Sequence, residues 1–355
     1  MKALVLAGGS GTRLRPFTHT LAKQLVPVAN KPVLFHCLEA VAAAGITETG
    51  VVVGGHGEDV RRAVGDGSRF GLRITWIQQD EPLGLAHCVM IAAGFLGADD
   101  FVMYLGDNIV SGGIGHLVKE FTAVRPDALL MVGPVADPQA YGIAEVGPDG
   151  RVLGLEEKPA EPAGDLALIG VYVFSAAIHR AVRAIAPSRR GELEITDAVA
   201  WLVGRGADVR AQVFSGYWKD TGRVDDLLDC NRELLATLEP VNLGTVDAAS
   251  DLLGPVSVAP GARVTGSRVV GPVVIGRDSV ITGSRIGPHC SIGAGCLISG
   301  AEIADSIVLD GAAVRDVRAI ERSVVGRHSR IGALAAGGGA RRLLLGDSSE
   351  VVIER

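Results

Sequence analysis

Three glycines near the amino terminus, followed by two basic residues, have the types and spacing that phosphate chemistry requires. Gly8, Gly9 and Gly11 come directly after a short apolar run. Glycines allow backbone N–H groups to turn toward one point, where they form a nest for phosphate oxygens. Arg13 adds a fixed positive charge, and Lys23 adds a mobile one further along. We interpret this segment as a cradle for a triphosphate, although a turn that merely requires glycine would show the same short pattern.

The glycine pattern differs from two common phosphate-binding motifs. A dinucleotide fingerprint would need a third glycine that is missing here, and no Gly-Lys-Ser or Gly-Lys-Thr step closes the loop as in a P-loop. The segment therefore predicts a phosphate site of another type.

One aspartate is a candidate ligand for a cation that would assist phosphate binding. Asp107 follows the apolar residues 101–105 almost directly. Its carboxylate offers the oxygen ligands that Mg²⁺ prefers. Aspartate at a strand end is also a common turn residue, so position alone leaves both interpretations open.

The composition favours two domains and substrates that are recognised by local charges. The chain has 355 residues, of which 48% are hydrophobic, and a net charge of −6. Without a basic field we expect neither nucleic acid nor a membrane as partner. Five cysteines without a C-x-x-C pair predict reduced thiols in a cytoplasmic protein. No apolar run reaches the roughly 18 residues of a membrane span.

Strand and helix patterns alternate over the first 110 residues, which indicates an α/β fold with a parallel sheet. Ligands of such sheets gather beyond the carboxyl ends of the strands, where the glycines and Asp107 would both lie. We expect strands over residues 2–7, 49–53, 72–77, 101–105, 129–132, 143–146, 152–155 and 168–174, and helices over 31–45, 58–64, 84–95, 176–185, 193–203 and 224–238. The first domain then ends near residue 240.

Beyond residue 250 aliphatic residues recur mostly every six positions and sometimes every five, with glycine, proline and serine between them. This period fits neither a helix face nor a hairpin and is typical of a hexapeptide β-helix, whose coils stack aliphatic side chains inward. Residues 241–355 therefore form a second domain. Cys290 and Cys296 occupy small positions within the repeat and are expected to be packed inside it.

Longer motifs resemble a known family. Residues 6–16 (LAGGSGTRLRP) and 23–28 (KQLVPV) are similar to the signature of sugar-nucleotide pyrophosphorylases, and residues 190–197 (RGELEITD) to a segment of glucose-1-phosphate thymidylyltransferases. The hexapeptide region resembles the left-handed β-helix of long-form members. The chain departs from the short-form enzymes at Leu83, where those have aspartate.

The resemblance implies a Rossmann-like nucleotidyltransferase domain over residues 1–240, with a mixed, mainly parallel sheet, followed by a left-handed β-helix over 241–355. It implies transfer of a thymidylyl group from dTTP to α-D-glucose 1-phosphate, giving dTDP-glucose and pyrophosphate for deoxysugar synthesis. Mg²⁺ is the implied cofactor. The resemblance further implies a homo-oligomer and inhibition by dTDP-sugars.

Residue roles follow from the same resemblance. Lys158 would hold the sugar phosphate, Gln79 and Gly84 would read the base, and Asp220 would join Asp107 on the metal. The implied catalytic residues are Arg13, Lys23, Asp107 and Lys158, and the implied substrate contacts are Leu6, Gly8, Gly9, Gly11, Thr12, Gln24, Gln79, Gly84, Asn108, Tyr141, Gly142, Glu157, Gly170 and Val171.

Three alternatives remain at this stage. A uridylyltransferase, or an enzyme for another sugar 1-phosphate, would share the chemistry, because thymine and uracil differ by one methyl group that is worth only about 1 to 3 kcal/mol. A bifunctional enzyme could add acyl transfer in the β-helix with His289 or His328 as base, although an exposed turn histidine is the commoner case. A sensor without turnover would not need the full charge-neutralising set.

Overall fold

The computed structural model describes residues 1–9, 11–333 and 340–353. Contacts divide the chain into two compact units, which we call the sheet unit (Met1–Ser10 and Leu34–Asp220) and the β-helix unit (Gly11–Val33 and Thr221–Arg355). This grouping differs from a simple division at residue 240, because residues 11–33 belong with the carboxyl-terminal part of the chain. A boundary of folding at residue 240 stays a prediction.

The parallel half of the sheet has β1 at its centre. Strands β6, β1, β4 and β5 lie side by side in that order and all run parallel. Their bounds are β1 (Lys2–Ala7), β4 (Glu48–Val53), β5 (Arg73–Gln78) and β6 (Phe101–Leu105). Since Ala7 pairs with Val53 and Leu6 with Leu105, the strands end together at one edge. The predicted strands 2–7 and 101–105 are confirmed residue for residue.

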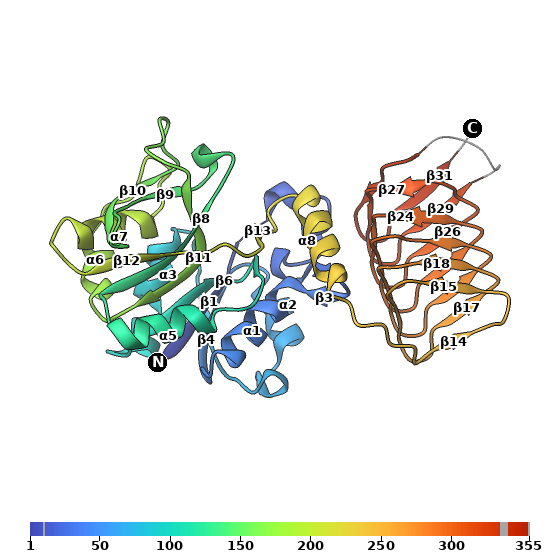
Figure 1. Ribbon diagram of the computed structural model, residues 1–355, viewed down its shortest axis with the longest axis horizontal. Coiled ribbons are helices and arrows are strands. Elements are labelled where there is room, and N and C mark those ends of the chain that lie inside the picture. Colours follow the sequence, from blue (N-terminus) through green and yellow to red (C-terminus); the bar gives the residue numbers. More distant parts are fainter. Residues whose placement is uncertain (10, 334–339, 354–355) are drawn as a thin grey trace. The chain divides into compact units, whose positions relative to one another are not determined.

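The other half of the sheet begins with β11, which runs antiparallel to β6. It contains β8 (Ala128–Pro134), β9 (Gly142–Val146), β10 (Val152–Glu157), β11 (Leu166–Phe174) and β12 (Val209–Val213). Among the described residues this makes a nine-stranded mixed sheet (Figure 1). Strand β12 was not predicted, although its alternating sequence VRAQV was a usable signal.

The helices of the sheet unit largely follow the predicted pattern. They are α1 (Val33–Ala43), α2 (Gly57–Val64), α3 (Leu85–Ile91), α4 (Ala93–Leu96), α5 (Gly115–Val124), α6 (Ile178–Ala184) and α7 (Ile195–Val203). Helix α1 starts at Val33 rather than at residue 31, because Lys31–Pro32 form the short strand β3. Helix α5 was missed, although Leu117 and Phe121 mark its buried face at helical spacing. Within the described residues, no helix has the length and apolar character needed to cross a membrane.

The carboxyl-terminal region is a β-helix with three parallel sheets in its described residues (Figure 1). The sheets are β14 (Thr245–Val246), β17 (Arg263–Thr265), β20 (Val280–Thr282), β23 (Leu297–Ser299), β26 (Ala313–Arg315), β29 (Arg330–Ala333) and β31 (Glu350–Ile353); β15 (Asp251–Leu253), β18 (Arg268–Val270), β21 (Arg285–Ile286), β24 (Glu302–Ala304) and β27 (Ile320–Glu321); and β16 (Val256–Val258), β19 (Val273–Ile275), β22 (Cys290–Ile292), β25 (Ile307–Val308), β28 (Val324–Val325) and β30 (Leu344–Leu345). The predicted fold class, an α/β domain with a mixed sheet followed by a β-helix, is confirmed.

The coil length explains the irregular repeat in the sequence. Arg263 pairs with Val280 and Val280 with Leu297, so these coils are 17 residues apart. Three strands share each coil, which requires steps of six with an occasional five. Cys290 and Cys296 are fully buried, as expected, and this burial raises the pKa of their thiols to about 12 and about 11.

Candidate functional site

The glycine segment lies where three parallel strands end together. Gly8 follows β1, Gly54 follows β4 and Gln79 follows β5. A Cβ built on Gly54 would lie 2.7 Å from the carbonyl oxygen of Gly8, and one built on Gly8 would lie 3.1 Å from Oε1 of Gln79. The backbones of β1 and β4 therefore approach so closely here that side chains are excluded. Leu6 is buried within β1, and Gly9 is exposed.

The predicted base-reading residues contact each other. Gln79 is buried, its Nε2 donates to the Gly84 carbonyl oxygen over 3.4 Å, and the same atom lies 3.2 Å from Nδ1 of His87. Gly84 has φ +103°, and a Cβ there would lie only 2.5 Å from the carbonyl oxygen of Leu193. Glycine at position 84 is thus required by the backbone of the RGELEITD segment, whatever it also contributes to a bound base.

A two-stranded ribbon places the two predicted metal ligands. Strand β7 (Asn108–Val110) pairs antiparallel with β13 (Trp218–Asp220), and Asn108 is directly opposite Asp220. Asp107 immediately precedes β7, so its carboxylate and that of Asp220 come from the same end of the ribbon. Both aspartates are half-buried.

The side chain of Asn108 contacts two neighbouring side chains inside the protein. Its side chain is buried, its Nδ2 donates to Oδ1 of Asp107 over 2.8 Å, and its Oδ1 accepts a hydrogen bond from Nε1 of Trp218 over 2.7 Å. Both ends of the amide are therefore engaged inside the protein. The geometry assigns Asn108 to the orientation of Asp107, and its contact with a substrate stays a prediction.

Gly170 supports this arrangement from β11. It has φ +84°, and a Cβ there would lie 3.3 Å from Cγ of Asn108 and 2.9 Å from Cδ1 of Leu105. A side chain at position 170 would therefore push Asn108 away from Asp107. Val171, the next residue, is fully buried in the strand.

Two carboxylates suit one type of divalent cation site. No cluster of three or more His, Cys, Asp or Glu side chains that could hold a metal occurs within residues 1–9, 11–333 and 340–353. A closed protein cage is thus not seen there, whereas Mg²⁺ commonly binds one or two carboxylates and takes its other ligands from water and substrate phosphates. Asp107 and Asp220 fit that second pattern.

The predicted sugar contacts meet around Glu157. Its carboxylate accepts a hydrogen bond from Oγ1 of Thr196 over 3.2 Å and lies 3.5 Å from Nζ of the exposed Lys158. A Cβ on Gly142 would lie 3.0 Å from Oε2 of Glu157, so glycine leaves room for that carboxylate. Tyr141 contacts the indole of Trp218 edge to face, with the ring centroids 5.5 Å apart.

The RGELEITD segment adds residues to this group that had no predicted role. Arg190 donates to Glu157 over 3.2 Å and lies 3.4 Å from the carboxylate of Glu194. Burial raises the pKa of the Glu194 carboxyl, and the nearby Glu157 adds to this, while a hydrogen bond from Ser188 opposes it. Burial and the charge of Glu157 likewise raise the pKa of Asp197. The match of the whole segment to the family was the available signal for these residues.

The remaining loop residues belong to the β-helix unit. Gly11 has φ +62°, and a Cβ there would lie 2.9 Å from the Cβ of Lys23. Lys23 and Gln24 are buried, and Oε1 of Gln24 accepts no hydrogen bond from any residue that the structure describes. Thr12 and Arg13 are exposed in a single 3₁₀ turn. Gln24 thus keeps a buried acceptor that a substrate donor could satisfy.

The two β-helix histidines lie in turns with left-handed backbone conformations, at φ +59° for His289 and +56° for His328. A Cβ on Gly311 would lie 2.3 Å from Nδ1 of His328, so that ring packs over a glycine of the preceding coil. Packing accounts for the position of His328, and the contacts of the two histidines with the described residues do not specifically favour acyl transfer.

A parallel strand that ends in glycines, the carboxylates of Asp107 and Asp220, and the Glu157–Lys158 pair are groups that suit phosphate and sugar chemistry. A family model described as "Nucleotidyl transferase" matches residues 2–237, and a second, described as "GMPPB C-terminal domain", matches residues 252–336. The chain belongs to the nucleotidyl transferase family.

Full-length relatives make the assignment more specific. A glucose-1-phosphate thymidylyltransferase from Streptomyces griseus is 58% identical over 353 residues, which cover 99% of each chain. One from Streptomyces antibioticus is 56% identical over 355 residues, covering 100% of each. A crystal structure of a Bacillus anthracis protein, provisionally named glucose-1-phosphate thymidylyltransferase and solved with sucrose, is 35% identical with a TM-score of 0.62 and covers 69% of this chain and 97% of that one. The predicted resemblance is therefore confirmed.

Proposed function

We propose that this enzyme transfers a thymidylyl group from dTTP to α-D-glucose 1-phosphate, giving dTDP-glucose and pyrophosphate. The observation that carries the proposal is the similarity, over the whole chain, to two Streptomyces proteins with this named activity. The grouping of Glu157, Lys158 and Gly142 supports it, because a carboxylate and an ammonium group near one glycine suit a sugar phosphate.

In the proposed reaction an oxygen of the sugar phosphate attacks the α-phosphorus of dTTP. The bond from that phosphorus to the oxygen bridging the α- and β-phosphates breaks, and pyrophosphate leaves. Two anions must approach each other, so the enzyme mainly aligns and neutralises them. Lys158 orients the attacking phosphate, whereas Arg13, Lys23 and the N–H groups of the glycine segment hold the triphosphate.

The proposed cofactor is Mg²⁺, held by Asp107 and Asp220. When bound, such an ion neutralises phosphate charge as a Lewis acid. Asn108 orients the Asp107 carboxylate for the ion, because its Nδ2 donates a hydrogen bond of 2.8 Å to Oδ1 of Asp107. The pairing of β7 with β13 brings Asp220 to the same end of the ribbon.

An assay of pyrophosphate release tests the assignments of the nucleotide base and of the sugar together. The purified enzyme receives Mg²⁺, glucose 1-phosphate and limiting dTTP, UTP, ATP, GTP or CTP in parallel, and then dTTP with other sugar 1-phosphates. We expect the highest kcat/KM for dTTP with glucose 1-phosphate. A higher kcat/KM for UTP would replace the thymidylyl assignment, and no release with glucose 1-phosphate would overturn the sugar assignment first.

Three finer predictions belong to the same proposal. A cytoplasmic location accords with the five cysteines, which form no disulfide among the described residues, and cell fractionation tests it. Light scattering of the purified protein tests the proposed homo-oligomer. Addition of dTDP-sugars to the pyrophosphate assay tests product-type inhibition.

A further inference from the structure

The loop that follows the glycine segment ends in a tight hairpin. Strands β2 (Pro27–Val28) and β3 (Lys31–Pro32) pair antiparallel, and only Ala29 and Asn30 connect them. Both connecting residues have positive φ, +48° and +61°, as a two-residue turn of this kind requires. Alanine rarely adopts this conformation, so other contacts must stabilise the tip of the hairpin.

Two hydrogen bonds attach this tip to the rest of the β-helix unit. The N–H of Ala29 donates to Oδ1 of Asn231 over 2.9 Å. Nδ2 of Asn30 donates to the carbonyl oxygen of Ile292 over 2.6 Å. Asn231 lies on helix α8 (Val224–Ala236), and Ile292 lies in the β-helix strand β22.

Asn231 links three segments at once. It is 1% exposed, and besides Ala29 it binds the β-helix through two further contacts. Its Oδ1 accepts a hydrogen bond from Oγ of Ser291 over 2.5 Å, and its Nδ2 donates to the carbonyl oxygen of His289 over 3.2 Å. Because a buried amide is costly unless it is paired, this side chain specifies the relative arrangement of hairpin, helix α8 and coil.

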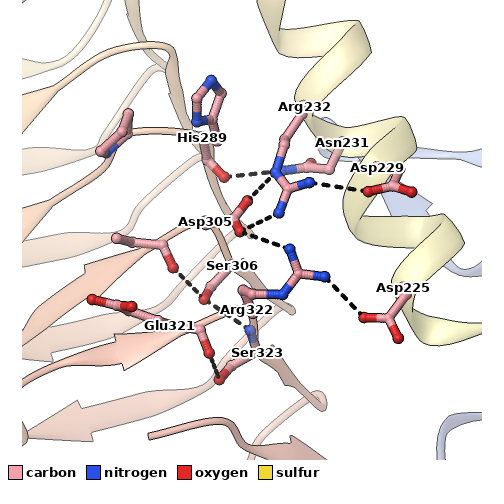
Figure 2. A network of polar contacts seen from close by, with 12 residues as sticks. Asp225, Asp229, Asn231, Arg232, His289, Asp305, Ser306, Glu321, Arg322 and Ser323 are labelled. Atoms are coloured by element: carbon pink, nitrogen blue, oxygen red, sulfur yellow. Dashed lines mark hydrogen bonds and ion pairs between the residues drawn. The ribbon is translucent and has the colours of Figure 1, made fainter. Parts of the chain in front are cut away.

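Ion pairs also attach helix α8 to the β-helix. Figure 2 shows Arg232 of α8 directed at Asp305, and Arg322 of the coil placed between Asp305 and Asp225. Arg322 and Asp225 are about half exposed, so each pair adds little energy alone. Together they oppose rotation of the helix that carries Asn231.

A second contact joins the loop to the last coil. Oγ1 of Thr20 donates to Oδ2 of Asp347 over 2.8 Å, and a Cβ on Gly346 would lie 3.1 Å from the Cβ of Pro16. Residues 11–33 are thus attached to the β-helix on both sides of Lys23.

We propose that the β-helix positions residues 11–33, which we call the triphosphate loop. Asn231 and Asn30 are the positioning residues that hold Lys23 and Arg13 in their binding conformation. This inference rests on the proposed function in one respect, namely that the loop binds a nucleoside triphosphate. It assigns the β-helix a part in nucleotide affinity, beyond its stability or assembly.

The expected effect is specific to one substrate. If the hydrogen bonds of Asn30 and Asn231 are lost, the loop spends part of its time in other conformations. The apparent affinity for the nucleotide then falls in proportion to the fraction of molecules whose loop is in the binding conformation. We expect the loss of one such buried hydrogen bond to weaken the affinity for dTTP roughly 3- to 10-fold. The predicted sugar contacts Glu157 and Lys158 lie in the sheet unit, so KM for glucose 1-phosphate should change less than about twofold.

The test uses the full-length protein with two anchor variants and one matched control. Asn30→Gly removes the bond to Ile292 while keeping a residue that tolerates positive φ, and Asn231→Ala removes the central amide. The control Ser284→Ala breaks comparable buried bonds inside the β-helix, where Oγ of Ser284 donates to the carbonyl oxygen of Thr282 and accepts from the N–H of Ala301, and both partners lie outside residues 11–33. Equilibrium dialysis measures the Kd of dTTP without sugar, and steady-state kinetics measure KM for both substrates.

We expect both anchor variants to raise the Kd and KM of dTTP, and Ser284→Ala to leave them unchanged while lowering the melting temperature. An unchanged Kd of dTTP in folded Asn30→Gly would overturn the proposal, and this variant decides the question if Asn231→Ala does not fold. An equal rise in Kd for Ser284→Ala would also overturn it, since general destabilisation would explain both. If the wild type binds another triphosphate in preference to dTTP, the proposed function fails and the same comparison is made with that nucleotide.

Discussion

Replacing Asn108 with leucine should separate its two candidate roles, orientation of Asp107 and contact with a substrate. The substitution keeps the branched shape of the side chain but removes both hydrogen bonds of the amide. The bond to the Asp107 carboxylate is charge-assisted and contributes about 1.5 to 3 kcal/mol, and the bond from Trp218 about 1 kcal/mol. Burial of the leucine side chain offsets about 1 kcal/mol of this. We therefore expect the free energy of unfolding to fall by about 1.5 to 3 kcal/mol.

The same bond determines the expected loss of activity. Without this hydrogen bond the Asp107 carboxylate loses the orientation that Asn108 provides, so kcat/KM should fall roughly 10- to 150-fold, which corresponds to 1.5 to 3 kcal/mol. Urea unfolding and pyrophosphate release measure the two effects. Trp218→Phe removes only the indole donor, and the double variant shows whether the Trp218 bond contributes independently of Asp107.

The reasoning would be refuted by a variant with normal stability and normal kcat whose KM for glucose 1-phosphate alone is raised. That result would support the sugar contact that the sequence predicts for Asn108. A fall in both stability and kcat at unchanged sugar KM supports the positioning role.

Three further substitutions test other parts of the site. Asp107→Asn should abolish turnover but shift the urea midpoint little, whereas the exposed control Asp251→Asn should retain activity; a near-normal rate for Asp107→Asn would exclude the metal role. Gly84→Ala should cost about 2 to 4 kcal/mol by urea unfolding, since it adds a clash with Leu193 to the strain of a backbone conformation, φ +103° and ψ 176°, that essentially only glycine adopts. Gly45→Ala, at φ +80° with open space around it, should cost only about 1 kcal/mol, so equal losses would contradict the clash. Because burial raises the pKa of Glu194 in the folded state, its protonated form stabilises the fold at low pH, and that contribution is lost as pH rises from the ordinary value of 4.5 through the raised one. Glu194→Gln should thus be more stable than the wild type at pH 8 but not at pH 4, and equal stability at both would contradict the shift.

Much of the architecture was predictable because it depends on local patterns. Apolar runs that end at glycine or at Gly-Asp gave β1 and β6 their exact bounds. The six-and-five spacing predicted the β-helix, because each inward aliphatic position recurs once per strand of a 17-residue coil. Motifs likewise identified Asp107, Asp220, Glu157 and Lys158 as residues of interest.

Only the tertiary structure showed what these residues contact. The contacts of Asn108 with Asp107 and Trp218, and the close approach of Gly84 to Leu193, could not be read from the sequence, whereas the predicted sugar and base contacts of these residues stay predictions. The tertiary structure also attached residues 11–33 to helix α8 through Asn231, which is 202 residues from Ala29 in sequence. Sequence determined the elements because hydrophobic period and turn residues act over a few positions, whereas the partner of a buried amide or a close backbone approach is decided only when distant segments pack together.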